Sequence, residues 1–482
     1  MSGDFRAGFA DLTSEVDDVV LPMTGAIPDW LTGALLRNGP ALFTVGGRRY
    51  HHWFDGLAML HRFGLGGGEV RYRNRFLDSR NLARVRATKK RQYDQFATNP
   101  SRNLWQKIID TLYFPLQSGD NQLVNIGQLD GCWLALGETP TQLMIDPDTL
   151  ATDGAFAFTG WLLSMVTSAH PVRDDARRAV FNVDSFVFPW LSRSKIWRLD
   201  DGSRRRRVIA SLPTARPSYT HSFGASENYL IITDMPFRVN PWAMLLGAVT
   251  GIPFIENFRW SNEDVKFLVI AKDSGEVTGE FHAPAFFAFH HVNAVEDGEG
   301  AIAVDIAAYA DPAVIARTYF KALFAPDGGT LPASRLVRYT VPIRGRGALL
   351  PPQVLAEPAF EMPVIHPARQ GQPYTMAYGC GFEVAGDFND MLFKIDVEGA
   401  LGANLRRWHA PGCYPSEPTF VPRPGATRED DGVVLSVVFD SGADRSFLLV
   451  IDAEPFVEIA RAEAPHAIPH GLHGIFAPQV SG

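Results

Sequence analysis

Four histidines stand far apart in the sequence, and each leads into or out of an apolar, strand-like segment. They are His170, His221, His290 and His473. Dispersed histidines of this kind converge on one central metal ion if the strands that carry them are arranged radially. The spacing differs from that of a zinc finger, where ligands lie a few residues apart. The sequence therefore suggests a metal centre on the axis of a radial β fold.

Three glutamates are candidates for holding these imidazoles in place. Glu138 ends an apolar strand-like segment, and Glu361 and Glu417 lie among apolar and proline residues, where an unpaired charge is costly. A ligating imidazole needs an acceptor for its second ring N–H, and buried carboxylates also balance the charge of a divalent ion. From the residues alone, the alternative that these glutamates cap turns or pair with arginines is equally open.

We predict that short strands joined by turns position these residues, because 43 glycines and 34 prolines are spread through the chain. An apolar strand ending in an acidic turn recurs at residues 143–148, 196–202, 268–275, 392–399 and 448–454. The interval is irregular but mostly about 50 to 70 residues, which is typical of a propeller with long insertions. We expect a single domain covering residues 10–482.

Two segments break the strand pattern. Residues 104–116 show helical spacing of apolar side chains, and residues 241–260 are apolar with few charges. Both are too short or too broken to span a bilayer. They either cover an edge of the propeller or form a patch that enters the lipid interface. The patch residues are Leu104, Trp105, Ile108, Ile109, Leu112, Trp242, Leu245, Leu246 and Phe254.

Composition limits the partners and the compartment. The net charge is −8 over 482 residues, without the basic stripe that nucleic acid requires, so nucleic acid is not an expected partner. Only Cys132, Cys380 and Cys413 are present, which supports neither a disulfide framework nor a paired-cysteine site. The N-terminus lacks the pattern of a secretory signal. These features favour the cytoplasm.

Ordered motifs give the chain a family resemblance. They are Leu36-Arg37-Asn38-Gly39-Pro40, His51-His52-Trp53-Phe54-Asp55-Gly56, the four histidine segments and Pro469-His470-Gly471-Leu472-His473-Gly474. Over nearly its whole length the chain resembles the carotenoid cleavage oxygenase family. It looks closest to the animal-type branch, which holds the β-carotene-cleaving oxygenases and the visual-cycle retinoid isomerase. Residues 217–223, 289–293 and 414–418 carry that likeness.

The resemblance implies an all-β fold, a seven-bladed β-propeller with iron(II) on its axis. A helical, loop-rich cap lies above the metal, with insertions near residues 90–120 and 237–260. The ligands implied are His170, His221, His290 and His473. The implied outer partners are Glu138 with His221, Glu361 with His290 and Glu417 with His473. His291 and His470 adjoin the motifs without matching ligand positions, and His51 and His52 are interpreted as structural.

The chemistry implied is oxidative cleavage of a C=C bond of a carotenoid or apocarotenoid by O2, giving aldehydes or ketones, with retinal as one such product. Four neutral imidazoles leave coordination positions of Fe(2+) open for dioxygen, and the electron-rich double bond supplies the electrons. No Ser-His-Asp or Cys-His arrangement is evident. Because a long polyene partitions into lipid, the resemblance favours peripheral membrane association.

Three alternatives remain. Stilbene-cleaving relatives carry a lysine immediately before the first outer glutamate, where this chain has Gly137. The retinoid isomerase cleaves an ester and isomerises without using O2, and its palmitoylated cysteine has no counterpart in residues 99–103. A propeller that acts only as a binding platform is the non-enzymatic alternative.

Overall fold

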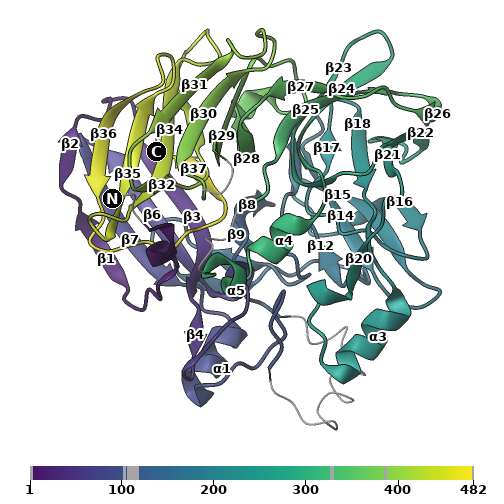
Figure 1. Cartoon of the computed structure of the whole chain (residues 1–482), viewed down its shortest axis with the longest axis horizontal. Helices are drawn as coiled ribbons and strands as arrows, with labels where there is room; N and C mark the ends of the chain where they lie inside the picture. Colours follow the sequence, from purple (N-terminus) through teal and green to yellow (C-terminus); the bar gives the residue numbers. More distant parts are fainter. Residues whose placement is uncertain (1–3, 101–104, 106–118, 326–330, 385–387, 480–482) are drawn as a thin grey trace.

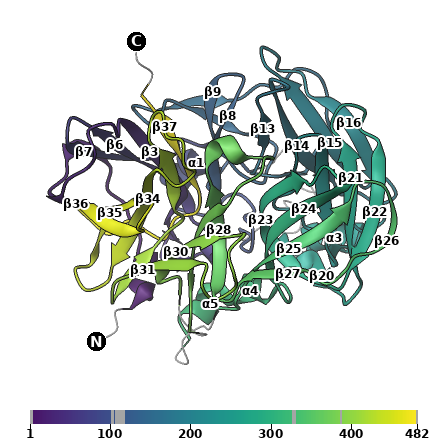
Figure 2. The same cartoon turned by 90° about the horizontal axis from the view of Figure 1, so that it is seen from above.

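The computed structural model describes residues 4–100, 105, 119–325, 331–384 and 388–479. Strands dominate this part of the chain, and seven sheets of four to six strands surround a central axis (Figure 1, Figure 2). The predicted all-β class is confirmed, and the seven sheets are the blades of a seven-bladed propeller.

We number the blades in the order of their main strands. Blade 1 contains β1 (Val16–Val20), β7 (Glu69–Phe76), β6 (Leu57–Gly66), β3 (Gly33–Leu42) and β37 (Gly474–Pro478). Blade 2 contains β11 (Thr152–Ala155), β10 (Leu143–Ile145), β9 (Cys132–Leu136) and β8 (Asn125–Leu129). Blade 3 contains β12 (Val166–Thr167), β13 (Val172–Asp174), β14 (Ala179–Phe186), β15 (Arg193–Asp200) and β16 (Arg207–Pro213).

The remaining four blades follow in chain order. Blade 4 contains β17 (Gly224–Ala225), β18 (Tyr229–Asp234), β21 (Val265–Ala271), β22 (Val277–Ala283) and β26 (Gly345–Ala348). Blade 5 contains β23 (Phe287–Glu296), β24 (Ala301–Tyr309), β25 (Arg335–Pro342) and β27 (Gln353–Ala356). Blade 6 contains β28 (Ala359–Ile365), β29 (Met376–Phe382), β30 (Met391–Asp396) and β31 (Leu405–His409). Blade 7 contains β32 (Cys413–Pro415), β33 (Thr419–Pro422), β34 (Gly432–Asp440), β35 (Arg445–Asp452), β36 (Val457–Glu463) and β2 (Met23–Gly25).

Strands from the two ends of the chain close the ring. The last strand, β37, pairs antiparallel with β3 of blade 1, with Leu36 opposite Ile475. The early strand β2 pairs with β36 of blade 7, with Met23 opposite Ala462. Each of these two blades therefore contains both early and late segments of the sequence. This exchange closes the ring by strand pairing between the two ends of the chain.

The five predicted hairpins are confirmed, and each is an outer hairpin of a different blade. They are β10–β11, β15–β16, β21–β22, β30–β31 and β35–β36. The acidic-turn pattern missed blade 1, whose outer hairpin β6–β7 turns through Gly67 and Gly68 instead. It also missed blade 5, because residues 343–352 leave that blade and carry β26 onto β22 of blade 4.

The core lies between neighbouring blades as well as within them. Leu35 and Phe63 of blade 1 and Leu435 and Leu448 of blade 7 are fully buried and belong to one apolar cluster. Strand β34 is buried on both faces along nearly its whole length. A continuous apolar run is typical of a strand that is covered on both sides.

The helices gather on one side of the ring, at the bottom of Figure 1. They are α1 (Arg80–Thr88), α3 (Pro241–Thr250), α4 (Ala313–Arg317) and α5 (Phe320–Leu323), with 3-10 turns η1 (Phe5–Phe9), η2 (Trp53–Asp55), η4 (Ile255–Asn257) and η5 (Pro367–Arg369) elsewhere in the chain. The small ribbons β4 (Thr44–Val45) with β5 (Arg48–Arg49) and β19 (Phe237–Val239) with β20 (Phe258–Trp260) complete the described elements.

Local sequence explains α3, which falls in one of the two predicted non-strand segments. The side chain of Asn240 accepts a hydrogen bond from the backbone N–H of Trp242 and caps the helix. Pro241 occupies the first turn, where its missing N–H costs nothing. Gly251 ends the helix with a left-handed φ of 87°.

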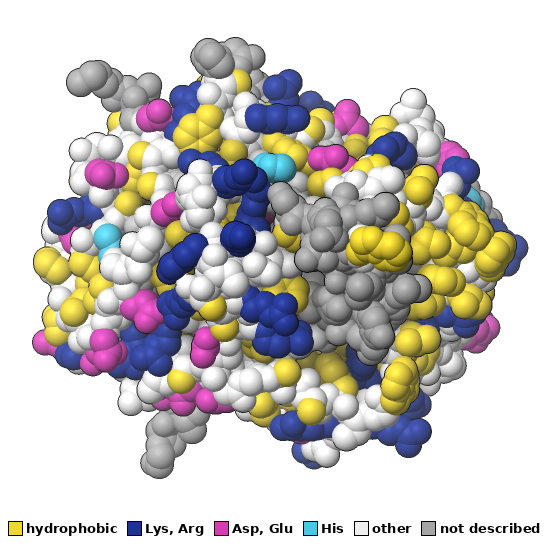
Figure 3. Space-filling model, turned by 90° about the horizontal axis from the view of Figure 1, so that it is seen from below, with side chains coloured by type: hydrophobic (Ala, Val, Ile, Leu, Met, Phe, Trp, Pro, Cys, Tyr) yellow, Lys and Arg dark blue, Asp and Glu magenta, His cyan; other side chains and the backbone are white. Residues whose placement is uncertain are grey.

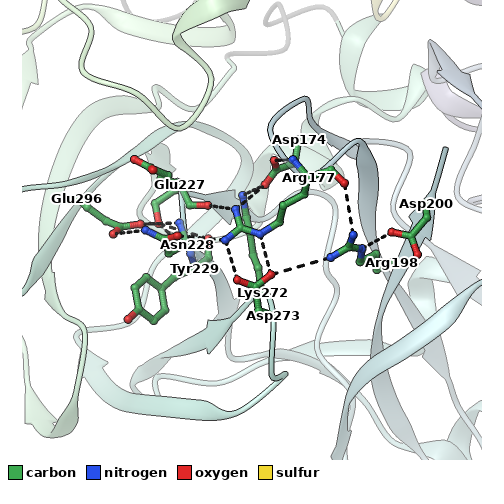
Figure 4. A network of polar contacts seen from close by, with 11 residues as sticks. Asp174, Arg177, Arg198, Asp200, Glu227, Asn228, Tyr229, Lys272, Asp273 and Glu296 are labelled. Atoms are coloured by element: carbon green, nitrogen blue, oxygen red, sulfur yellow. Dashed lines mark hydrogen bonds and ion pairs between the residues drawn. The ribbon is translucent and has the colours of Figure 1, made fainter.

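A buried ion pair joins blade 3 to blade 4. Nζ of Lys272 donates to Oδ2 of Asp174 at 2.8 Å, and the two side chains are only 4% and 6% exposed. Arg177 contacts the same carboxylate and also Asp273, so the group forms a connected network (Figure 4). The pair connects the inner strand β13 of blade 3 to the end of β21 in blade 4.

Replacing Asp174 with Ala is expected to destabilise the protein by about 3 kcal/mol, because it leaves Lys272 buried without its carboxylate. The thermal unfolding temperature would fall, and the Asp174→Leu/Lys272→Met double variant would recover most of the loss. Arg173→Gln is the control, because its partner Asp201 is solvent-accessible and such pairs contribute less than about 1 kcal/mol. Equal melting temperatures for Asp174→Ala and the control would contradict the role given to the pair.

Candidate metal centre

Four imidazoles meet on the propeller axis although they come from four different blades. His290 lies in β23, His221 and His473 lie just before β17 and β37, and His170 lies between β12 and β13. One ring nitrogen from each histidine lies within 4.8 Å of the other three. The structure thus brings together the four histidines that the sequence suggested as metal ligands.

The nitrogens that face one another are the Nε2 atoms. Those of His170 and His221 are 3.0 Å apart, and those of His290 and His473 are 3.1 Å apart. The cluster is almost closed to solvent, with His290 and His473 only 8% and 5% exposed. At these distances either a ring N–H of one histidine points at its neighbour or a cation lies between the nitrogens.

Each of three imidazoles is held from behind by a carboxylate. Nδ1 of His221 lies 2.7 Å from Oε1 of Glu138. Nδ1 of His290 lies 2.5 Å from Oε2 of Glu361, and Nδ1 of His473 lies 2.6 Å from Oε1 of Glu417. All three expected pairings are present. An imidazole that donates its Nδ1–H to a carboxylate directs the Nε2 lone pair forward, into the cluster.

Burial controls the charge states of the cluster. Burial and the neighbouring histidines hold the pKa of His170 well below its usual value. Burial also lowers the pKa of His473, against the opposing effect of Glu417. Burial raises the pKa of the Glu361 and Glu417 carboxyls, but their histidine partners outweigh it and the net change is downward. The His473 imidazole is therefore neutral, and the Glu361 and Glu417 carboxyls are ionised.

This donor set fits a divalent metal ion. Neutral Nε2 lone pairs cannot hydrogen-bond to one another, and a cation between them removes their repulsion. An ion about 2.0 to 2.2 Å from each nitrogen places opposite ligands about 4 Å apart, close to the spread of the cluster. His170, His221, His290 and His473 are the side chains that would hold it.

Two nearby histidines do not join the cluster. His291 is half-buried between Ser222 and Thr233, with Nδ1 2.9 Å and Nε2 2.7 Å from the respective hydroxyls. Nε2 of His470 lies 2.9 Å from the backbone oxygen of Phe5. Both contact local partners away from the cluster, in agreement with their exclusion from the ligand set.

The motif at residues 51–56 is structural, as expected. Asp55 is fully buried and accepts hydrogen bonds from the backbone N–H of Ala97 and the hydroxyl of Thr98. His52 lies 3.0 Å from the backbone oxygen of Ile315, just before the end of α4. The motif thereby holds the segment around residue 97 and α4 together on the cap side of the ring.

A cavity of about 280 Å³ adjoins the cluster. His221, His290, His473 and Glu138 line it at one place, and aromatic and aliphatic side chains form most of the remaining wall. They include Phe54, Phe96, Phe254, Phe289, Phe360, Phe382, Phe388, Met165, Met244 and Leu331. An apolar cavity with a few polar groups is typical of a site for a hydrophobic small molecule.

The chain is similar to known proteins over nearly its whole length. The family described as retinal pigment epithelial membrane protein matches residues 9–478. The chain belongs to the carotenoid cleavage oxygenase family. It is 33% identical over 486 residues to carotenoid cleavage dioxygenase 8 of Arabidopsis thaliana, covering 95% of this chain and 83% of that relative.

An animal relative and a solved structure agree with the assignment. The chain is 30% identical over 506 residues to β,β-carotene 15,15'-dioxygenase of Rattus norvegicus, covering 95% of this chain and 88% of that relative. The structure of a variant of Synechocystis apocarotenoid oxygenase superposes with a TM-score of 0.85 at 26% identity, covering 99% of this chain and 98% of that one. Plant and animal oxygenases match this family member at similar identities.

The apolar side chains predicted to form one membrane patch differ in exposure, since some are on the surface and others line cavities. Trp105, Trp242 and Leu246 are exposed at 75%, 51% and 63%. Leu245 lines a smaller cavity of about 100 Å³ beneath α3, and Phe254 lines both this cavity and the larger one. Leu104, Ile108, Ile109 and Leu112 lie outside the described residues.

Sequence reasoning missed a second part of this surface. Trp190 and Leu191, in the turn between β14 and β15, are exposed at 86% and 53%. The ring of Trp190 lies 4.6 Å from that of Trp242 in α3, so the turn and the helix form one apolar surface. Figure 3 views this side of the molecule, with hydrophobic side chains gathered on the right. The signal was the run of Phe, Pro, Trp and Leu at residues 186–191, which does not alternate as a strand does.

Replacing His290 with Ala is expected to reduce bound metal to less than about a tenth of the wild-type amount, because even loss of an outer partner costs roughly 10- to 100-fold in affinity. Elemental analysis of the purified protein after metal loading and desalting measures the change. His470→Gln is the matched control, since it alters a buried histidine outside the cluster. Equal metal content in His290→Ala and wild type would show that His290 is not a ligand.

Proposed function

We propose that this chain uses a ferrous ion, held by His170, His221, His290 and His473, to cleave a C=C bond of a carotenoid or apocarotenoid with O2. Membership of the carotenoid cleavage oxygenase family gives the reaction class, which is oxidative cleavage to two carbonyl products. The observation that carries the proposal is the position of three of the four histidines in the wall of a mostly apolar cavity.

The reaction balances without an external reductant. Both atoms of O2 are inserted, the C=C bond breaks, and each carbon becomes a carbonyl carbon. When bound, ferrous iron with open coordination positions supplies the redox chemistry between O2 and the electron-rich double bond.

The protein side chains hold and surround the reactants. The glutamates fix the imidazole rings through Nδ1, and the hydroxyl of Tyr219 donates to both oxygens of Glu138 at 2.8 and 3.0 Å. Aromatic side chains such as Phe96 and Phe289 in the cavity wall exclude water and contact an extended polyene along its length. No side chain needs to transfer a proton.

The stilbene alternative is disfavoured by the space around Gly137. A Cβ atom at this position would collide with the side-chain oxygen of Gln122. Gln122 is itself held by the hydroxyl of Thr139 at 2.8 Å. A lysine at position 137 would have to displace this side chain. The chain therefore lacks the phenol-directed lysine of stilbene-cleaving relatives, and Gln122 occupies the space that its Cβ atom would enter.

The test is turnover under labelled dioxygen. Iron-loaded protein is expected to consume one O2 per substrate and to place one ¹⁸O atom in each of two carbonyl products from β-carotene or an apocarotenoid. Stilbenes and a retinyl ester complete the substrate panel, and metal-free protein is the control. Full metal retention without O2 uptake on any polyene would contradict the proposal, and turnover of the ester without O2 would favour the isomerase alternative.

We also propose that the apolar surface formed by Trp190, Leu191, Trp242 and Leu246 enters the lipid interface so that a polyene can pass from the membrane to the cavity. Among the described residues, no helix has both the length and the apolar composition needed to cross a bilayer. The smaller cavity beneath α3 shares Met165, Met244 and Phe254 with the larger one, which supports a path from this surface to the metal centre.

A Trp190→Ser/Trp242→Ser/Leu246→Ser triple variant is expected to bind phosphatidylcholine vesicles at least roughly tenfold more weakly, because it removes three apolar side chains from the interface. Vesicle flotation measures the binding. Leu350→Ser is the control, because Leu350 is also highly exposed but lies between β26 and β27. Equal weakening by the control would contradict the proposed surface.

A further inference from the structure

Arg37 places a buried positive charge beside the histidine cluster. Its side chain is 4% exposed, and its Nη1 donates to Oε2 of Glu417 at 2.8 Å. Its Nη2 donates to the backbone oxygen of Leu472 at 2.6 Å. The other oxygen of Glu417, Oε1, contacts Nδ1 of His473. One carboxylate therefore connects the guanidinium to a candidate ligand.

The strand pairing that closes the ring creates this arrangement. Arg37 in β3 lies opposite Gly474 in β37, the residue immediately after His473. A Cβ atom at Gly474 would collide with the backbone oxygen of Leu36 and with the side chain of Arg37, so glycine leaves the space that the arginine crosses. The backbone N–H of Gly474 also donates to Oε2 of Glu417 at 2.8 Å.

The three glutamates differ in what lies behind them. Glu138 accepts a hydrogen bond from the neutral hydroxyl of Tyr219. Glu361 accepts a hydrogen bond from the backbone N–H of Met362 at 2.8 Å. Only Glu417 faces a full positive charge, and among the described residues Arg37 is the only lysine or arginine in an ion pair with any of the three.

The net charge of the three glutamates and Arg37 determines which charge of metal ion the centre prefers. The three carboxylates carry three negative charges, and the guanidinium cancels one of them. The remaining two equal the charge of a divalent ion. Without the guanidinium, one negative charge would be in excess. That excess favours a trivalent ion over a divalent one, because Coulomb attraction grows with the charge of the ion and burial limits screening.

We propose that Arg37 is a positioning residue that sets the net charge of the metal centre and thereby keeps bound iron in the divalent state. The inference rests on the proposed iron centre and deepens it, because ferrous iron is the form that reaction requires. It also gives a function to the motif at residues 36–40, which the sequence suggested only as a family feature.

The experiment compares the ferric-to-ferrous ratio of bound iron at a fixed redox poise in three variants. Arg37→Met is expected to raise the ratio on the order of tenfold, and Glu417→Gln is expected to lower it by a similar factor. The double variant is expected to return near the wild-type ratio, because it removes one charge of each sign. Electron paramagnetic resonance of ferric iron and a ferrous chelation assay measure the two forms without any substrate.

A structural role alone predicts a different result. Arg37→Lys keeps the charge and should keep the ratio, whereas Arg338→Met removes a guanidinium paired with buried Asp305 and should affect stability only. If Arg37→Met loses its iron, the test compares Glu417→Gln with the double variant instead. These two proteins differ only in whether the positive charge of Arg37 is present. Equal ratios in those two variants would overturn the inference and leave the metal centre intact. Failure of wild-type protein to retain iron would instead overturn the proposed centre.

Discussion

Ring nitrogens of four histidines lie within 4.8 Å of one another. His290 and His473 donate their Nδ1–H to carboxylates, so their Nε2 lone pairs face each other at 3.1 Å. This arrangement is unfavourable without a cation, so the remainder of the structure has to enforce it. A ring of seven sheets does so, because its innermost segments end at one axis. Each imidazole comes from a different blade, and no single blade could place two of them in this way.

The carboxylates behind the imidazoles extend the same constraint outward. Each one fixes a ring orientation through Nδ1, and each is fixed in turn by a different partner. The partners are a tyrosine hydroxyl, a backbone N–H and a guanidinium. Buried charges are tolerated here because every carboxylate has hydrogen-bond donors and because the metal ion of the proposed centre would complete the balance.

The proposed route to this centre lies on the side of the ring that carries the helices. Aromatic side chains from the blades and from the segments around residues 96 and 254 form the cavity wall. The exposed tryptophans of α3 and of the turn between β14 and β15 lie on the surface beside the smaller cavity. A hydrophobic path from surface to metal suits a substrate that is poorly soluble in water.

The sequence by itself predicted the all-β class, the five acidic-turn hairpins and the four candidate histidines, and the family resemblance implied the three glutamate partners. These are local or motif-borne features: strand alternation, turn residues and polar groups set among apolar ones. It did not reveal the blades whose outer connections lack the acidic turn, nor the apolar turn at Trp190, because neither follows the repeated pattern.

Only the tertiary structure decided which residues complete the site. Arg37 and Glu417 are separated by 380 positions, and His473 reaches the cluster because β37 pairs with β3 when the ring closes. Local propensity carries no information about such contacts, since they arise from the closure of the whole ring. The candidate ligands were therefore readable from the chain, but the guanidinium that faces Glu417 was placed only by the fold.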